Sequence, residues 1–339
     1  MRLAKELDRM TYEQLLAVRL CDLRLSIEGT PLESGVTRLY AELRARGLRV
    51  KPHFWLSEEW FTPDKVPGFA IPFYLAHPRL AKLERKQMLE VEGGAKKDCL
   101  RIMRHEAGHA IDNAFKLHSR RGYQKLFGSF AQPYPDWYKP EPHSRNYVLH
   151  LPAWYAQAHP AEDFAETFAV WLAPGSRWRK QYQGWPALRK LEYVDKLMNE
   201  LQGKTPLNIS RDKVGQLSEI EITLAEHYRK KQWHYAFQGP PDYDRELLRI
   251  FSSEPRHKSC PSAVAFLKSY RRELCREVAE GTGIHNYAID QILIQMINRC
   301  RELKLRVPLT EQRTKQKVLV FLAVQTINGI HTGYHRIAL

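Results

Sequence analysis

The stretch LRIMRHEAGHAIDNA, residues 100–114, has the apolar periodicity of an amphipathic helix. His105 and His109 are four residues apart, so both lie on one face of such a helix. Gly93-Gly94 interrupts the chain upstream, and Asp98 is a candidate N-cap. Apolar residues at spacings of three and four predict one buried stripe, which is separate from the histidines: Leu100, Met103, Ala107, Ala110, Ile111 and Ala114.

The two imidazoles and the acid beside them have the chemistry of a zinc hydrolase. Two histidines four apart can bind one Zn²⁺, and Glu106 then lies next to the ion. There it would act as a general base toward a water whose pKa the cation lowers, and would later pass the proton to a leaving amine. Because the chain has 14 histidines, a five-residue pattern can also arise by chance. A surface helix with incidental histidines is therefore the alternative.

A catalytic zinc needs a third protein ligand from elsewhere in the chain. The metzincin solution is excluded, because the positions three and six residues after the second histidine hold Asp112 and Phe115 rather than glycine and histidine. Residues 159–172 instead predict an acidic amphipathic helix. On it Glu162 and Glu166 lie four apart, so one carboxylate can bind the metal while the other orients a ligand imidazole. The spacing alone does not rank the two.

Together these segments resemble the gluzincin clan and, within it, the bacterial zinc-binding metallopeptidases, whose acidic helix also reads His-Pro-x-Glu-Asp-Phe-Ala-Glu-Thr, as residues 159–167 do. A more distant resemblance is to the catalytic domain of anthrax lethal factor, which has a tyrosine seven residues before its ligand glutamate. The resemblance spans roughly residues 40–175 and implies a zincin-like fold. It also implies Glu162 as the third ligand, Glu166 as the acceptor that orients a ligand, and Tyr155 as the donor to the developing oxyanion.

Other side chains compete for these roles. His159 precedes a proline and is more often an N-cap or a loop contact than a ligand. Trp154 and Tyr147 lie close enough to Tyr155 in the sequence for another aromatic residue to fill its role. Three further histidines are expected at the surface or in loops: His118, His143 and His150. Asp112 and Asn113 are expected to be solvated, with a hydrogen bond near the site as the alternative.

The composition is that of an ordinary soluble globular protein. The chain has 339 residues, of which 43% are hydrophobic, and is long enough for one large domain or two smaller ones. Charges throughout the N-terminal segment leave no apolar core for a signal peptide, and the longest apolar run, residues 318–324, is too short to span a bilayer. We therefore expect a cytoplasmic protein with no membrane partner. The five cysteines form no Cys-x-x-Cys pair, so reduced, mostly buried thiols are expected.

The net charge of +15 raises the question of nucleic-acid binding. Basic and aromatic residues alternate at 177–180 and 227–235. The positive excess is nevertheless spread along the chain without a concentrated basic arm. A nucleic-acid partner is thus an alternative that the sequence does not favour.

The order of predicted elements suggests two parts. Helices are expected within residues 10–47, and strands at 48–56 and 69–75. The loop 132–154, rich in proline and aromatic residues, joins the two metal-bearing helices and is a candidate for a cleft wall, with packing inside the domain as the alternative. After Gly239-Pro240-Pro241 the chain is helical again and carries no catalytic constellation.

We therefore predict an α+β, mostly helical fold. A zincin-like domain at residues 1–238, with its catalytic core at about 48–175, would place a small sheet beside two metal-bearing helices, and residues 239–339 would form a helical C-terminal module. The predicted function is a Zn²⁺-dependent metallopeptidase acting on a peptide or protein substrate. The alternative is a regulatory or interaction protein with a structural zinc site and a basic helical tail. Glu106 and Tyr155 favour the enzyme, since a structural site needs no general base. The oligomeric state stays open.

Overall fold

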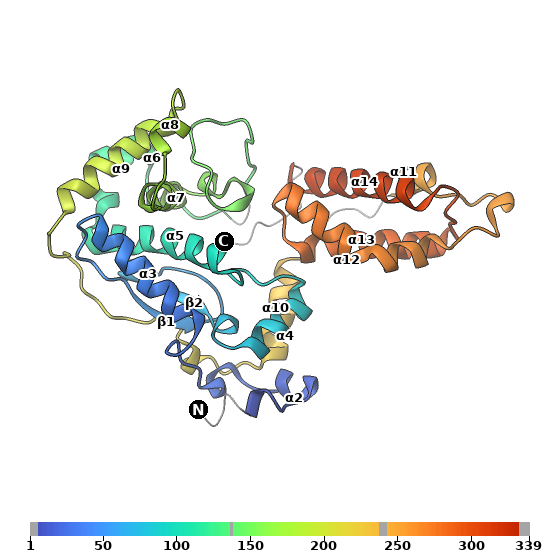
Figure 1. Ribbon diagram of the computed structural model, residues 1–339, viewed down its shortest axis with the longest axis horizontal. Helices are drawn as coiled ribbons and strands as arrows, with labels where there is room; N and C mark the ends of the chain where they lie inside the picture. The colour runs from blue at the N-terminus through green and yellow to red at the C-terminus, as the bar shows by residue number, and fades with distance from the viewer. Residues whose placement is uncertain (1–5, 136–137, 237–242, 332–339) are drawn as a thin grey trace. The chain divides into compact units, whose positions relative to one another are not determined.

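The computed structural model in Figure 1 describes residues 6–135, 138–236 and 243–331. The described chain is mostly helical and contains a two-stranded parallel sheet, which confirms the predicted fold class at this level. Two compact units are present: the first comprises most of the chain up to Lys230, and the second comprises Met88–Glu90, Asp136–Lys139 and the chain from Lys231 onward. The expected domain boundary after residue 238, with Gly239-Pro240-Pro241, lies outside the described residues and stays a prediction.

Short and medium-length helices make up most of the first unit. In chain order they are α2 (Tyr12–Leu16), α3 (Pro31–Ala45), α4 (Pro78–Met88), α5 (Lys96–Phe115), α6 (Arg121–Phe127), α7 (Pro160–Leu172), α8 (Trp178–Gln181), α9 (Ala187–Leu201) and α10 (Leu224–His234). The last residues of α4 and of α10 belong to the second unit. Short 3₁₀ segments lie between them: η1 (Leu20–Leu23), η2 (Phe73–Ala76), η3 (Leu117–Ser119), η4 (Pro152–Gln157) and η5 (Leu217–Glu219).

The sheet is small and parallel. β1 (His53–Ser57) pairs with β2 (Gly68–Pro72), with His53 opposite Gly68 and Ser57 opposite Pro72. Every residue of β2 is buried, as is usual for a parallel strand covered on both faces. Both strands are shorter than predicted. Pro52 has no N–H to extend the ladder before β1, and the chain turns into η2 directly after β2.

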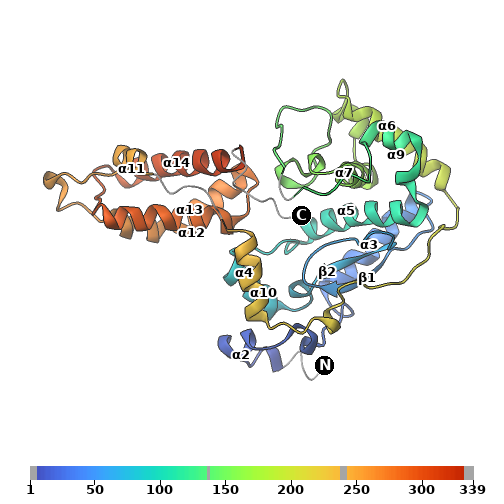
Figure 2. The same ribbon diagram turned by 180° about the vertical axis from the view of Figure 1, so that it is seen from behind.

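The helix α5 lies between α3 and α7 (Figures 1 and 2) and also contacts β2. Its approach to α7 is unusually close, because a Cβ added at Gly108 would lie 2.8 Å from the Cα of Ala165. A glycine on one helix opposite an alanine on the other removes the side chains that would keep the two backbones apart. This crossing brings the two predicted metal-bearing helices together.

Two local predictions were less accurate. The helical pattern that starts at Tyr12 breaks after Leu16, because the amides of Leu20 and Cys21 donate to the carbonyls of Ile222 and Ile220 instead of continuing a helix. Asp98 is not the N-cap of α5, since that position is occupied by Ala95, which makes no side-chain cap. Asp98 instead lies in the first helical turn, where its negative charge suits the helix dipole.

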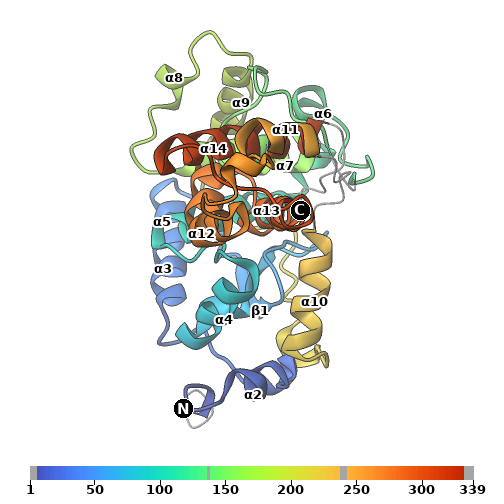
Figure 3. The ribbon, with the colours of Figure 1, turned by 90° about the vertical axis from the view of Figure 1, so that its right-hand side faces the viewer.

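The second unit is an all-helical bundle in its described part. It contains α11 (Asp244–Ile250), η6 (Pro255–His257), α12 (Ala263–Thr282), α13 (Asn286–Glu302) and α14 (Glu311–His331). Figure 3 shows α11 to α14 lying together. They share one apolar core, to which Leu267, Leu293 and Leu322 belong. Ion pairs join α12 to α13 through Arg271 and Asp290, and α13 to α11 through Arg299 and Asp244. The helical spacing predicted for this part of the chain is therefore confirmed.

None of the described helices combines the length with the apolar character that a bilayer crossing requires. The five cysteines are free, and three of them, Cys99, Cys275 and Cys300, are buried. Burial raises the pKa of each of these three thiols to about 12. They are therefore protonated at neutral pH and have little nucleophilic character.

Candidate metal centre

Three donor atoms converge where α5 meets α7. The Nε2 atoms of His105 and His109 lie 3.1 Å apart, and Oε2 of Glu162 lies 3.0 Å from the first and 3.2 Å from the second. His105 and Glu162 are buried, and His109 is partly exposed. Among the residues that the structure describes, these three form the group of side chains arranged to hold a metal ion.

The triangle formed by these three donor atoms, Nε2 of His105, Nε2 of His109 and Oε2 of Glu162, has the dimensions of a zinc site. Donor atoms placed tetrahedrally about 2.0–2.1 Å from a cation would be about 3.3 Å apart. The three observed separations of 3.0–3.2 Å are close to that value. Two imidazole nitrogens and one carboxylate oxygen also match the donor set of catalytic zinc sites, which leaves one position open.

The electrostatics of the three residues also suit a cation. Burial alone would lower the pKa of His105, yet its hydrogen bonds with Glu162 and Glu166 raise that pKa well above its usual range. Burial would likewise raise the pKa of Glu162, but the charge of His109 and hydrogen bonds to both histidines hold it well below its ordinary value. The cluster thus stabilises positive charge at the point where the three donor atoms meet.

Glu166 orients one of the imidazoles. Its Oε1 lies 2.8 Å from Nδ1 of His105, and its Oε2 accepts a hydrogen bond from the amide of Leu151 at 2.7 Å. Because Nδ1 is held by this carboxylate, Nε2 is the nitrogen left to bind a metal ion, and it faces Glu162 and His109. Glu162 and Glu166 therefore contact opposite nitrogens of the same ring, a difference that their spacing on the helix did not reveal.

Glu106 is buried beside the triangle but supplies none of its three donor atoms. Thr62, from the chain between the two strands, donates its hydroxyl to Oε2 of Glu106 at 2.8 Å. Burial raises the pKa of Glu106, while the nearby charges of His105 and His109 lower it in part. One carboxylate oxygen is thus fixed by Thr62, a contact that nothing in the sequence predicted.

Tyr155 lies near the cluster. Its ring centroid is 5.5 Å from that of His105, and the two planes are tilted by 56°. The two residues before it, Ala153 and Trp154, have left-handed backbone angles, with φ of 59° and 56°. Two consecutive non-glycine residues in this region cost of order 1–3 kcal/mol each, and such strain is commonly found at functional sites. Among the alternatives considered from the sequence, Tyr147 lies elsewhere, with its ring 4.3 Å from the ammonium of Lys190.

A second tyrosine, Tyr134, reaches the cluster from the loop that precedes α7. Its hydroxyl donates to Oε1 of Glu162 at 3.0 Å, and its ring stacks on His159 with centroids 3.9 Å apart. His159 is the N-cap of α7, which confirms the preferred sequence interpretation. Its Nδ1 accepts from the amide of Ala161, so its protonated Nε2 donates to the carbonyl of Gln132. Both ring nitrogens are therefore occupied.

The other polar residues named from the sequence lie around this centre. Asp112 and Asn113 are buried rather than solvated. Asp112 accepts from the ring and the amide of His118, and the amide group of Asn113 donates to the carbonyls of Pro63 and Val66. His150 is partly buried against the carbonyl of Arg101, whereas His143 is exposed.

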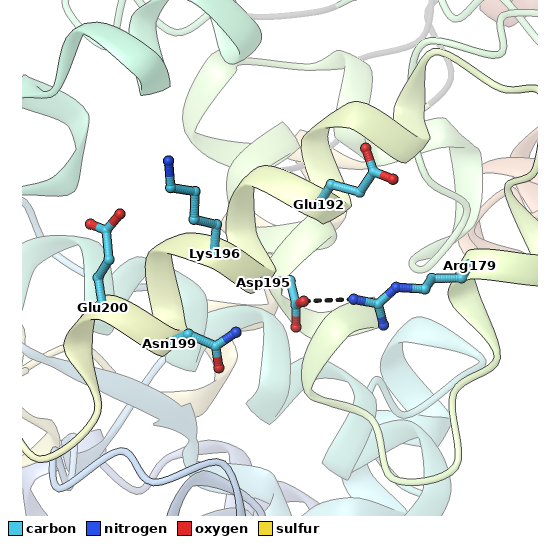
Figure 4. A pocket seen from close by; sticks show the side chains of 6 residues that line it. All are labelled: Arg179, Glu192, Asp195, Lys196, Asn199 and Glu200. Carbon is cyan, nitrogen blue, oxygen red and sulfur yellow. Dashed lines mark hydrogen bonds and ion pairs between the residues drawn. The ribbon is translucent and has the colours of Figure 1, made fainter.

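A hollow elsewhere on the first unit lacks this chemistry. It is lined by Arg179, Glu192, Asp195, Lys196, Asn199 and Glu200. Figure 4 shows five of these side chains along α9 and Arg179 on α8, with Arg179 paired to Asp195. Mixed and paired charges on an open surface offer no converging donor set. The candidate centre therefore remains the triangle between α5 and α7.

No curated protein and no solved structure matches the chain. A family model does match part of it, and the matched segment contains both histidines of the triangle together with Glu106, Glu162 and Glu166. Residues 80–175 match the family described as "Putative zinc-binding metallo-peptidase".

Proposed function

We propose that the chain is a zinc-dependent metallopeptidase in which His105, His109 and Glu162 hold Zn²⁺. One observation carries the proposal. Three donor atoms converge within 3.0–3.2 Å of one another, while Glu106, adjacent in sequence to His105, stays outside the triangle with its own hydrogen bond from Thr62. The family match over residues 80–175 supports the same conclusion.

Each residue around the metal has a distinct role in peptide hydrolysis. When bound, Zn²⁺ would polarise the substrate carbonyl and lower the pKa of water. Glu106 accepts a proton from the attacking water and returns it to the leaving amine. Burial raises the pKa of Glu106 above its ordinary value, which makes this carboxylate a stronger proton acceptor. Tyr155 donates to the carbonyl oxygen as it becomes negative.

A purely structural zinc site fits these contacts less well. Structural sites usually close with a fourth protein ligand, whereas the described residues supply three donors at this position. A structural site would also have no use for a buried carboxylate that is held next to the metal without binding it. The Glu106–Thr62 contact is therefore an argument for catalysis.

The replacement Glu106→Gln tests this function. We expect the variant to bind zinc as the parent does and to cleave a mixed peptide library about 10²- to 10⁴-fold more slowly, since it keeps the shape but loses the base. Glu192→Gln, on the surface of α9, is the matched control and should leave both properties unchanged. Cleavage by E106Q at the parental rate would remove Glu106 from the mechanism. Zinc binding without any cleavage by the parent would favour the structural site.

The finer predictions from the sequence accompany this proposal. They are a zincin-like domain at residues 1–238, a C-terminal helical module at 239–339, a peptide or protein substrate, a bacterial source and a cytoplasmic location. The likeness to the anthrax lethal factor catalytic domain also stays a prediction. Nucleic acid stays a partner that the sequence does not favour, because the positive excess is spread along the chain without a concentrated basic arm.

A further inference from the structure

The carboxylate of Glu162 is engaged at both of its oxygens. Oε2 faces the two imidazole nitrogens at 3.0 and 3.2 Å, and Oε1 accepts a hydrogen bond from the Tyr134 hydroxyl at 3.0 Å. A carboxylate held in this way presents a single oxygen to a metal ion. The hydroxyl of Tyr134 therefore fixes which oxygen of Glu162 serves as the ligand atom.

Tyr134 is itself fixed by the start of α7, the helix that carries Glu162. Its ring lies flat against His159, at 3.9 Å between centroids and 20° between planes. His159 is locked by its bonds to the amide of Ala161 and the carbonyl of Gln132. The loop is also close to the helix at Gly128, whose φ of 107° favours glycine and whose added Cβ would lie 3.2 Å from the ring of Pro160. The phenol is thus placed by several contacts.

The exposure of the two partners differs sharply. Glu162 is 4% exposed, whereas Tyr134 is 46% exposed. The tyrosine therefore covers one side of the buried carboxylate and presents its own other side to solvent. Tyr155 occupies a different place, with its ring next to His105, so the two tyrosines need not share one role.

We infer that Tyr134 is a positioning residue of the metal centre, which holds Glu162 as a one-oxygen ligand and couples the loop before α7 to metal affinity. This inference rests on the metal-binding part of the proposed function and is independent of hydrolysis. Partners that hydrogen-bond to a metal ligand typically change metal affinity by about 10- to 100-fold when they are removed. The phenol-to-carboxylate bond is a contact of that kind.

The test compares Tyr134→Phe with the parent, both as full-length chains. Competition with a chelator gives the Zn²⁺ dissociation constant, and the visible spectrum after Co²⁺ substitution reports the ligand geometry. We expect Y134F to bind Zn²⁺ about 10- to 100-fold more weakly and to shift the Co²⁺ spectrum, because Oε1 becomes free to approach the ion. Tyr147→Phe, in the same loop but against Lys190, is the matched control and should change neither quantity.

The outcomes separate this inference from the proposed function. Parental zinc affinity and an unchanged Co²⁺ spectrum in Y134F would overturn it, even if the parent is an active peptidase. So would a loss of cleavage by Y134F without any change in affinity or spectrum, since Tyr134 would then act on the substrate and not on Glu162. A parent chain that binds neither metal would overturn the metal centre itself, and this inference with it.

Discussion

Replacing Gly108 with alanine should loosen the contact between α5 and α7 on which the candidate centre depends. The added Cβ would lie 2.8 Å from the Cα, 3.1 Å from the carbonyl oxygen and 3.3 Å from the Cβ of Ala165. The first two of these are backbone atoms, so no side-chain rotation can relieve the overlap, and the helices must move apart by several tenths of an ångström. Because Glu162 is on α7 and the histidines are on α5, the same movement widens the donor triangle.

The expected cost follows from two opposing effects. Overpacking of a buried contact typically costs about 1–3 kcal/mol. The gain in helix propensity from glycine to alanine offsets about 0.8–1.0 kcal/mol of this. Since the overlap involves the backbone, we take the upper part of the range and expect the free energy of unfolding to fall by about 2 kcal/mol.

Urea denaturation of the metal-free chain measures this change, and chelator competition measures zinc affinity in the same variant. Gly281→Ala, in α12, is the control, because nothing lies within 4 Å of the added Cβ. It should stabilise its helix by up to about 1 kcal/mol and leave zinc affinity unchanged. A G108A variant with parental stability and parental zinc affinity would refute the argument that this close crossing builds the site.

Two further predictions concern single hydrogen bonds. Thr62→Val removes the hydrogen-bond donor to Glu106 and should lower kcat about 10- to 100-fold at unchanged zinc affinity. Thr62→Ser keeps the hydroxyl and should restore kcat. An unaffected kcat in Thr62→Val would exclude a role of Thr62 in positioning Glu106. The hydrogen bond from His118 to Asp112 raises the pKa of His118, so this pair stabilises the fold below about pH 6.5 and loses its effect as pH rises through the folded pKa. An NMR titration should show the raised value in the parent and a lower one in Asp112→Asn; equal values would contradict the assignment.

The helices of the metal centre were predictable because the sequence pattern that determines each helix is local. Apolar periodicity indicated α5 and α7 at residues 100–114 and 159–172, where each buries one continuous stripe, and it placed helices within residues 10–47, where α3 lies. The start of α5 was not predictable, because the N-cap at Ala95 makes no side-chain hydrogen bond and so leaves no signal in the sequence. The division of the segment after Tyr12 depends on backbone bonds to residues 220 and 222, far away in the chain.

The contacts within the site were predictable only in part, because they depend on residues that are distant in the sequence. The spacing of Glu162 and Glu166 placed both on one helix but did not say which nitrogen of His105 each would meet. Thr62 and Tyr134 reach Glu106 and Glu162 from loops, where no periodicity exists and position is set by tertiary packing. The roles assigned to all of these side chains stay predictions until metal binding and cleavage are measured.

Zinc K-edge X-ray absorption on the purified full-length chain, together with its zinc content, tests the metal centre most directly. We expect one zinc per chain with two imidazole nitrogens at about 2.0–2.1 Å and an oxygen donor at a similar distance. Glu162→Gln should weaken zinc binding strongly, while Glu192→Gln should not. A chain that holds no transition metal, a zinc bound through cysteine sulfur, or undiminished zinc affinity in E162Q would contradict the account.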